Sequence, residues 1–120
     1  MKKWIVKVVF LIAIVLPTGV VANKDYRIMG NSGIMFFVAV SLAQKNNEDV
    51  YRLAVGEACA GKAICQAQFW TGDAPSKFPI SDAQVESKLV HWQQNLNTGL
   101  RRWLVNCESS SLFSNERECM

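Results

Sequence analysis

Four cysteines are the residues whose type and spacing most directly indicate chemistry. Five residues separate Cys59 from Cys65, and Cys107 and Cys119 lie near the end of the chain. Such residues can bind zinc, form a redox centre or close structural disulfides. Zinc and redox sites usually use Cys-x-x-Cys pairs, which the sequence lacks, and His91 is its single histidine. We therefore predict structural disulfides, with no metal and no cofactor.

Four cysteines allow three disulfide pairings, and the sequence leaves all three open. We prefer Cys59 with Cys65 and Cys107 with Cys119, because the turn between the first two contains a glycine and can close. The small loop formed in this way would carry Lys62. We favour a loop that simply ties down a corner of the fold. The alternative is a preorganised projection that carries Lys62 into the cleft of a partner.

The start of the chain indicates export. Three lysines precede an apolar run at residues 8–16, and Pro17 interrupts it, which is typical of a secretory signal peptide. Small residues favour cleavage after Ala22, so we expect a signal peptide at residues 1–22 and one small domain at residues 23–120. The apolar run is too short to span a bilayer, so we expect no membrane insertion after cleavage. The short lysine-rich signal suggests a periplasmic or secreted bacterial protein, in a compartment where disulfides form.

Net charge argues against two classes of partner. The chain has a formal charge of +3, but Lys2, Lys3 and Lys7 belong to the expected signal peptide. Without them, the remaining basic side chains equal the acidic ones in number. A neutral domain has no electrostatic footprint for nucleic acid or anionic lipid, so we expect neither as a partner.

Hydrophobic periodicity predicts the first half of the domain. Residues 34–42 alternate with period two and are expected to form a strand, although a buried helix is a rival for so apolar a run. A helix is predicted over residues 47–60, beginning at Asn residues that can cap it. Residues 62–71 alternate again and predict a half-buried strand. Residues 23–32 are polar and are expected to form a leading arm.

Capping and turn signals organise the second half. Residues 72–79 contain two prolines and predict a loop. Ser81 and Gln84 form a capping-box pattern, and we expect the following helix to reach about residue 96, with Val85, Leu89, Trp92 and Leu96 along one stripe. Residues 100–106 predict a strand, and a polar tail is expected from about residue 108.

These elements predict one small, disulfide-stabilised α+β domain. It would contain about three strands and two helices in the order β-α-β-α-β, with both helices packed on one face of the sheet. The strand order does not follow from the sequence.

Three polar residues were weighed as catalytic candidates. Glu57 falls on the expected buried stripe of its helix, where a carboxylate must pair or stay near water. An ion pair with an arginine or simple exposure explains it more readily than an active-site acid does. Asp73 could act with a second carboxylate, but no motif supports this. His91 lies away from the apolar stripe of its predicted helix and is expected to meet solvent. We therefore expect no enzymatic activity.

Aromatic and basic residues predict a protein-binding surface. Tryptophan beside arginine is a composition enriched in protein interfaces. The candidate surface combines the loop after Trp70 with the corner at residues 59–65. The candidate binding residues are Lys62, Trp70, Asp73, Phe78, Arg101 and Arg102.

The expected function is therefore binding of another protein by an exported, non-enzymatic, disulfide-stabilised domain. An inhibitor or immunity factor against an envelope-active enzyme fits this description. One alternative is an accessory structural component of a bacterial envelope assembly. A second is a small hydrolase that uses Glu57 or Asp73.

Overall fold

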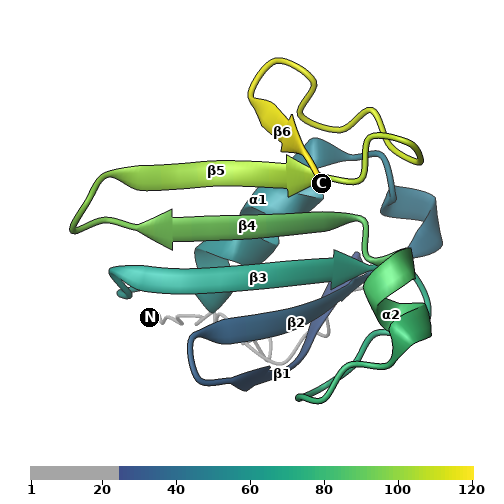
Figure 1. The fold of residues 1–120 in the computed structure, drawn as a ribbon, viewed down its shortest axis with the longest axis horizontal. Helices are drawn as coiled ribbons and strands as arrows, with labels where there is room; N and C mark the ends of the chain where they lie inside the picture. Colours follow the sequence, from purple (N-terminus) through teal and green to yellow (C-terminus); the bar gives the residue numbers. More distant parts are fainter. Residues whose placement is uncertain (1–24) are drawn as a thin grey trace, which may run out of the picture.

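A computed structural model describes residues 25–120, so the expected signal peptide lies outside the described residues. The described chain forms a six-stranded mixed sheet with two α-helices (Figure 1). The elements are β1 (Tyr26–Ser32), β2 (Met35–Val40), a 3-10 turn (Leu42–Gln44), α1 (Glu48–Ala58), β3 (Ile64–Trp70), α2 (Asp82–Ser87), β4 (Val90–Asn95), β5 (Leu100–Val105) and β6 (Arg117–Cys119). No helix in residues 25–120 is long and apolar enough to cross a membrane.

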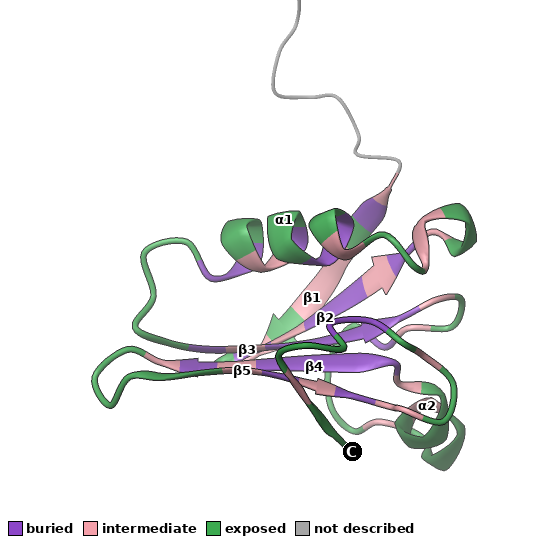
Figure 2. Cartoon of the chain, turned by 90° about the horizontal axis from the view of Figure 1, so that it is seen from above, coloured by how far each residue is buried: buried purple, intermediate pink, exposed green. Residues whose placement is uncertain are grey.

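The strands lie in the sheet in their order along the chain, from β1 to β6. The pairs β1/β2, β3/β4 and β4/β5 are antiparallel, whereas β2/β3 and β5/β6 are parallel. Parallel neighbours need a crossover connection, and α1 provides the one between β2 and β3. This crossover places α1 against one face of the sheet, with α2 on the other side (Figure 2).

Local signals in the sequence account well for α1. The side chain of Asn47 caps the helix by accepting a hydrogen bond from the backbone N–H of Asp49 at 3.1 Å. Glu48 and Asp49 lie in the first turn, where negative charge complements the helix dipole. Tyr51 and Ala54 are fully buried against the sheet. The helix predicted over residues 47–60 is therefore confirmed.

The long second helix predicted from Ser81 is wrong. Its capping box is present, since Ser81 and Gln84 exchange side-chain and backbone hydrogen bonds at 3.1 Å. The helix nevertheless ends at Ser87 and contains no buried residue, with Val85 56 % exposed. Residues 90–95 form β4 instead, because pairing with β3 and β5 supplies backbone hydrogen bonds on both sides. Burial of Trp92 suits strand spacing as well as helix spacing.

The expected α+β fold of about three strands is also wrong, because the structure is mostly sheet. The expected leading arm contains β1, which pairs with β2 in a hairpin. The segment expected as a polar tail contains the buried residues Leu112 and Phe113 and ends in β6. The two helices lie on opposite sides of the sheet instead of sharing one face (Figure 2).

A small second core lies on the side of the sheet away from α1. Met35, Phe37 and Trp70 are buried there beneath the loop that follows β3. Phe78 of this loop contacts the ring of Phe37 edge-on at 5.2 Å. The loop also passes very close to β1, since a Cβ atom on Gly30 would lie only 2.3 Å from the carbonyl oxygen of Ser76. Glycine at this position therefore permits the loop to cover the core.

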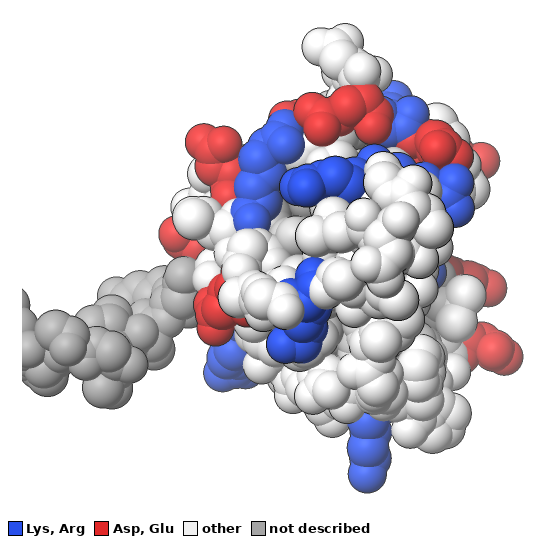
Figure 3. Space-filling view, turned by 90° about the vertical axis from the view of Figure 1, so that its left-hand side faces the viewer, with Lys and Arg blue, Asp and Glu red and all other residues white. Residues whose placement is uncertain are grey.

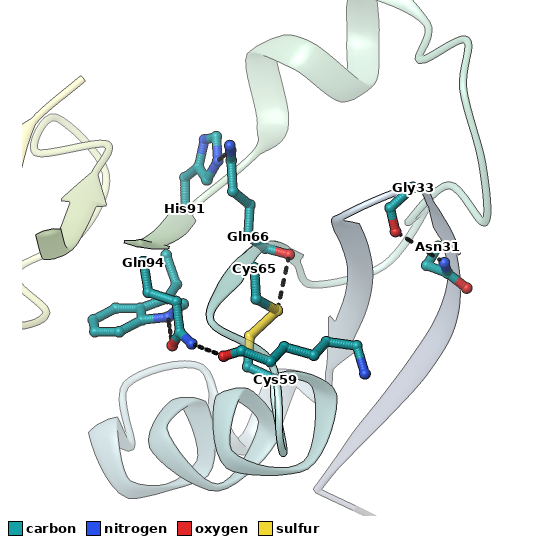
Figure 4. The surroundings of a disulfide bond; sticks show 9 residues. Asn31, Gly33, Cys59, Cys65, Gln66, His91 and Gln94 are labelled. Atoms are coloured by element: carbon teal, nitrogen blue, oxygen red, sulfur yellow. Dashed lines mark hydrogen bonds between the residues drawn. A yellow bond between two sulfur atoms is a disulfide. The ribbon is translucent and has the colours of Figure 1, made fainter. Parts of the chain in front are cut away.

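Both disulfides have the pairing preferred from the sequence. Cys59–Cys65 joins the end of α1 to the beginning of β3, with a Cα–Cα distance of 5.7 Å (Figure 4). Cys107–Cys119 joins the segment after β5 to β6, with a Cα–Cα distance of 5.4 Å. The first bond holds the C-terminal end of α1 against the sheet, and the second holds the C-terminal segment against β5.

Candidate functional site

A groove lies between α1 and the hairpin of β4 and β5, on the helix-covered face of the sheet. It encloses a volume of about 400 Å³. It is lined by two tryptophans, three charged side chains and a short apolar stretch of α1: Trp92, Trp103, Arg52, Arg101, Glu116, Val55 and Gly56. We refer to these seven residues as the indole groove.

The two tryptophans come together because of strand register. Trp92 of β4 and Trp103 of β5 are directly opposite each other in the antiparallel pair, so their side chains share one face. Their ring centroids are 4.7 Å apart. Phe113 stacks on Trp103, with the ring centroids 4.0 Å apart and an angle of 6° between the ring planes. This packing buries both indoles almost completely and makes the groove floor rigid.

Gln94 connects the groove to the disulfide-closed corner. Its side-chain oxygen accepts a hydrogen bond from the indole N–H of Trp92 at 3.0 Å. Its side-chain nitrogen donates to the backbone carbonyl of Lys62 at 2.8 Å. Figure 4 shows Gln94 on the same side of the sheet as the Cys59–Cys65 disulfide. The corner loop therefore helps to orient the Trp92 ring.

The two arginines of the groove differ in their partners. Arg52 forms salt bridges with Glu116 at 3.1 Å and Glu48 at 3.5 Å. The hydrogen bond to Glu116 is the main cause that raises the pKa of the Arg52 guanidinium. Arg101 is exposed, with its guanidinium 5.9 Å from the centre of the Trp92 ring. It has no carboxylate partner within residues 25–120.

The two indole N–H groups differ in their partners. The N–H of Trp92 donates to the side-chain oxygen of Gln94, whereas no hydrogen bond from the N–H of Trp103 is found in residues 25–120. A group that enters the groove can meet the positive charge of Arg101 and the small exposed parts of the two rings. Carboxylate and carbonyl oxygens are the natural acceptors for a guanidinium.

A wider hollow lies on the opposite flank of α1. Its volume is about 740 Å³, and it is lined by Tyr26, Asp49, Arg52, Leu53, Gly56 and Glu57. We refer to it as the acidic hollow, because Asp49 and Glu57 outnumber its one arginine. The hydroxyl of Tyr26 donates to the carboxylate of Glu57 at 2.5 Å.

Glu57 is exposed, which is one of the two explanations preferred from the sequence, and the stripe expected to face the core is not the buried face of the helix. The buried face of α1 consists of Val50, Tyr51, Ala54 and Ala58, while Leu53 is 61 % exposed. The helix is thus rotated relative to the expected stripe, so Glu57 can bond to Tyr26 at the surface. Asp73 lies in the loop after β3 and is not among the residues that line this hollow. The structure does not bring the two acids together.

The surface expected around Trp70 is not continuous. Trp70 is only 1 % exposed, and its indole N–H donates to the backbone carbonyl of Gln84 at 2.7 Å, so it holds α2 in place. Phe78 is half exposed and packs on the side away from α1. Lys62 lies on the α1 side, with its ammonium group 5.6 Å from the ring of Phe36.

Arg101 and Arg102 are also separated, because consecutive strand residues point to opposite faces. Arg102 donates to the side chain of Gln93 at 2.7 Å and reaches Glu118 at 3.4 Å. On this same face, a ring nitrogen of His91 lies 2.8 Å from the side-chain oxygen of Gln66 (Figure 4). His91 is buried rather than solvent-exposed, since it belongs to a strand and not to a helix.

Arg101 is predicted from the sequence as a binding residue, but Arg52 and Glu116 beside it are not. Arg52 and Glu116 are 64 residues apart in the chain, and only the fold brings them into contact. The sequence predicts a helix at Trp92, so the cross-strand pairing of Trp92 with Trp103 does not follow from it. The alternation of Arg101 and Trp103 on one strand face was the available signal for this site.

Comparison with known proteins yields no match: no family model, no curated protein and no solved structure resembles the chain significantly. Among residues 25–120, no group of three or more His, Cys, Asp or Glu side chains is arranged to hold a metal ion.

Proposed function

We propose that this protein is an exported, disulfide-stabilised domain that binds another protein through the indole groove. We further propose that it acts as an inhibitor or immunity factor against an envelope-active enzyme. The observation that carries the proposal is the exposed guanidinium of Arg101, without a carboxylate partner in residues 25–120, beside the packed indoles of Trp92 and Trp103.

Tryptophan and arginine are the side chains that most often dominate the energy of protein interfaces. Val55 and the small exposed parts of the two indoles supply apolar contact, and a guanidinium can form two parallel hydrogen bonds with a carboxylate. A partner that brings an acidic side chain to Arg101 would fill the groove without disturbing an existing salt bridge of that arginine. The chemistry of these residues supports the proposal of specific binding.

Rigidity of the groove supports an inhibitory role. The Cys59–Cys65 disulfide holds the end of α1, which forms one wall. The Cys107–Cys119 disulfide closes the segment that contributes Phe113 and Glu116 to the other side. A preformed site loses little conformational entropy on binding, and this favours tight complexes. Complete pairing of the four cysteines is also compatible with export.

Site-specific crosslinking tests this proposal. A photo-crosslinking residue replaces Val55 at the groove wall, and the purified oxidised protein is irradiated in envelope and culture extracts. The control carries the same residue at Ala83, on the exposed α2 at the opposite side of the sheet. We expect one partner to be captured from position 55 and not from position 83. The identified partner is then purified, and its enzymatic activity is measured with and without the protein.

The variant Arg101→Gln provides the quantitative test. It should weaken binding of the purified partner by about tenfold or more, because a charged interface contact is lost. Its thermal unfolding midpoint should stay close to that of the wild type, since Arg101 is exposed. If Arg101→Gln bound the purified partner with unchanged affinity, the indole groove would not be the binding site. Capture of several envelope proteins, none of them inhibited, would instead favour a component of an envelope assembly.

A further inference from the structure

Gly56 lies where the indole groove and the acidic hollow meet. Both are lined by Arg52 and Gly56, so the two depressions are neighbours across α1. Figure 2 shows that the outer surface of α1 is exposed along its length. At Gly56 this surface carries no side chain, and the helix backbone itself is accessible between the two depressions.

Neither packing nor backbone conformation within the described chain accounts for this glycine. A Cβ atom at position 56 would meet nothing within 4 Å beyond its chain neighbours and its own helix backbone. Gly56 is also absent from the glycines with positive φ angles. Glycine destabilises the interior of a helix relative to alanine, and no contact within the described chain offsets this loss of stability. A common use of such a glycine is close approach of another chain to the backbone.

The charges on the two sides of Gly56 are opposite in sign. On the groove side, Arg101 has no carboxylate partner in residues 25–120, while Arg52 is paired with Glu116. On the hollow side, Asp49 and Glu57 carry negative charge, and Glu57 accepts the hydroxyl of Tyr26. Figure 3 shows basic and acidic side chains interspersed over the upper part of one end of the molecule. A complementary ligand must therefore be acidic at one point and basic at another.

We infer that an extended protein segment crosses α1 over Gly56, with an acidic side chain against Arg101 in the indole groove and a basic side chain in the acidic hollow. This inference rests on the proposed function and names the chemistry of its partner. A helix with its side chains is about 10 Å across. An extended chain covers about 3.3 Å per residue, and its side chains alternate between two faces. The acidic and basic residues should therefore be about four positions apart, where both face the protein.

Synthetic peptides and NMR test this inference directly. The probes are unstructured 12-residue peptides that carry one Glu and one Lys, spaced from one to seven positions apart. Matched peptides carry Gln in place of either charged residue. Each is titrated into the oxidised, ¹⁵N-labelled protein while the indole N–H signals of Trp92 and Trp103 are recorded. We expect saturable shifts of these signals, with affinity highest at a spacing of four and about tenfold lower for the Gln peptides.

The variants Gly56→Ala and Gly56→Leu provide the matched pair for the helix crossing. Both should fold with an unchanged or higher thermal midpoint, because alanine and leucine favour helix. Peptide affinity should fall in Gly56→Ala and be lost in Gly56→Leu. Ala83→Leu adds three carbon atoms to α2, against four in Gly56→Leu, and should leave peptide binding unchanged. Wild-type peptide affinity in Gly56→Leu, or no peptide binding to the wild-type protein, would overturn the inference.

These outcomes are distinct from failure of the proposed function. If Gly56→Leu still binds the partner captured at position 55 while Arg101→Gln does not, the groove binds a protein but no segment crosses α1. If both variants bind the partner normally, the groove itself is not the binding site.

Discussion

His91 is a residue whose environment makes its charged form costly. It lies on the face of β4 turned away from α1, where one ring nitrogen is 2.8 Å from the side-chain oxygen of Gln66. Burial is the main cause that lowers its pKa to about 4, and the positive charges of Lys88 and Arg102 lower it further. Because Gln66 offers an oxygen, the neutral ring carries its proton on the nitrogen that faces Gln66. Arg102 is itself paired with Glu118 at 3.4 Å.

This pKa predicts that the protein loses stability as the pH falls from about 6.5 to about 4. In that range the unfolded chain binds a proton at His91 and the folded protein does not, so acid favours unfolding. The full loss amounts to about 3 kcal/mol. Denaturant unfolding at pH 7 and pH 4.5 measures it. The variant His91→Gln should show a smaller decrease between the two pH values. An equal decrease in variant and wild type would mean that other groups cause it.

At the scale of single elements, α2 is a short helix held by its ends. It has six residues and no buried side chain, so burial contributes little to its formation. The capping box of Ser81 and Gln84 satisfies two backbone N–H groups at its beginning. Trp70 then donates to the backbone carbonyl of Gln84 and attaches the helix to the sheet. Local hydrogen bonds therefore determine where α2 begins. It ends where the following residues pair with β3 and β5 as strand β4.

The cap should contribute measurably to stability. Replacing Ser81 with alanine removes the acceptor for the backbone N–H of Gln84 and should cost about 1 kcal/mol. Ser87 lies at the other end of α2 and bonds weakly to the carbonyl of Gln84 at 3.4 Å, so Ser87→Ala is the matched control with a smaller effect. Chemical denaturation of both variants gives the comparison. Equal effects of the two changes would contradict a role for the capping box.

At the scale of the whole molecule, the C-terminal segment from Cys107 to Cys119 completes the site. The segment from Cys107 to Cys119 covers the end of the sheet and places Phe113 on Trp103. It also carries Glu116, which holds Arg52 of α1. Helix, sheet and C-terminal segment thus meet at the indole groove, so the groove depends on contacts between parts of the chain that are distant in sequence.

Removal of the two disulfides should have unequal effects. Cys107–Cys119 closes a loop twice as long as that of Cys59–Cys65, with sequence separations of 12 and 6. Loop-closure entropy then predicts that Cys107→Ser with Cys119→Ser costs about 0.6 kcal/mol more than Cys59→Ser with Cys65→Ser. Denaturant unfolding of the two double variants measures the difference. The first variant should also change the tryptophan fluorescence more, because Phe113 stacks on Trp103; an unchanged spectrum would count against this coupling.

Interactions between residues close in the chain were enough to predict several features. The helix over residues 47–60 was readable because its cap and its apolar spacing are local. The strand at residues 62–71 was predicted from alternation and the strand at residues 100–106 from strand propensity. The disulfide pairing preferred from the turn at Gly61 agrees with the structure. The capping box at Ser81 was also identified correctly.

Tertiary contacts decided the rest. Residues 90–95 form a strand because β3 and β5 flank them. The local sequence does not contain that information, since burial of Trp92 fits both the two-residue period of a strand and the 3.6-residue period of a helix. The same applies to β1 and β6, whose polar sequences become strands only beside their partners. The sequence alone was enough to predict the structural disulfides of this protein and to select Arg101 as a candidate binding residue. Only the tertiary structure brought Arg52, Trp92 and Glu116 to that arginine, because strand register and long-range packing are properties of the folded chain.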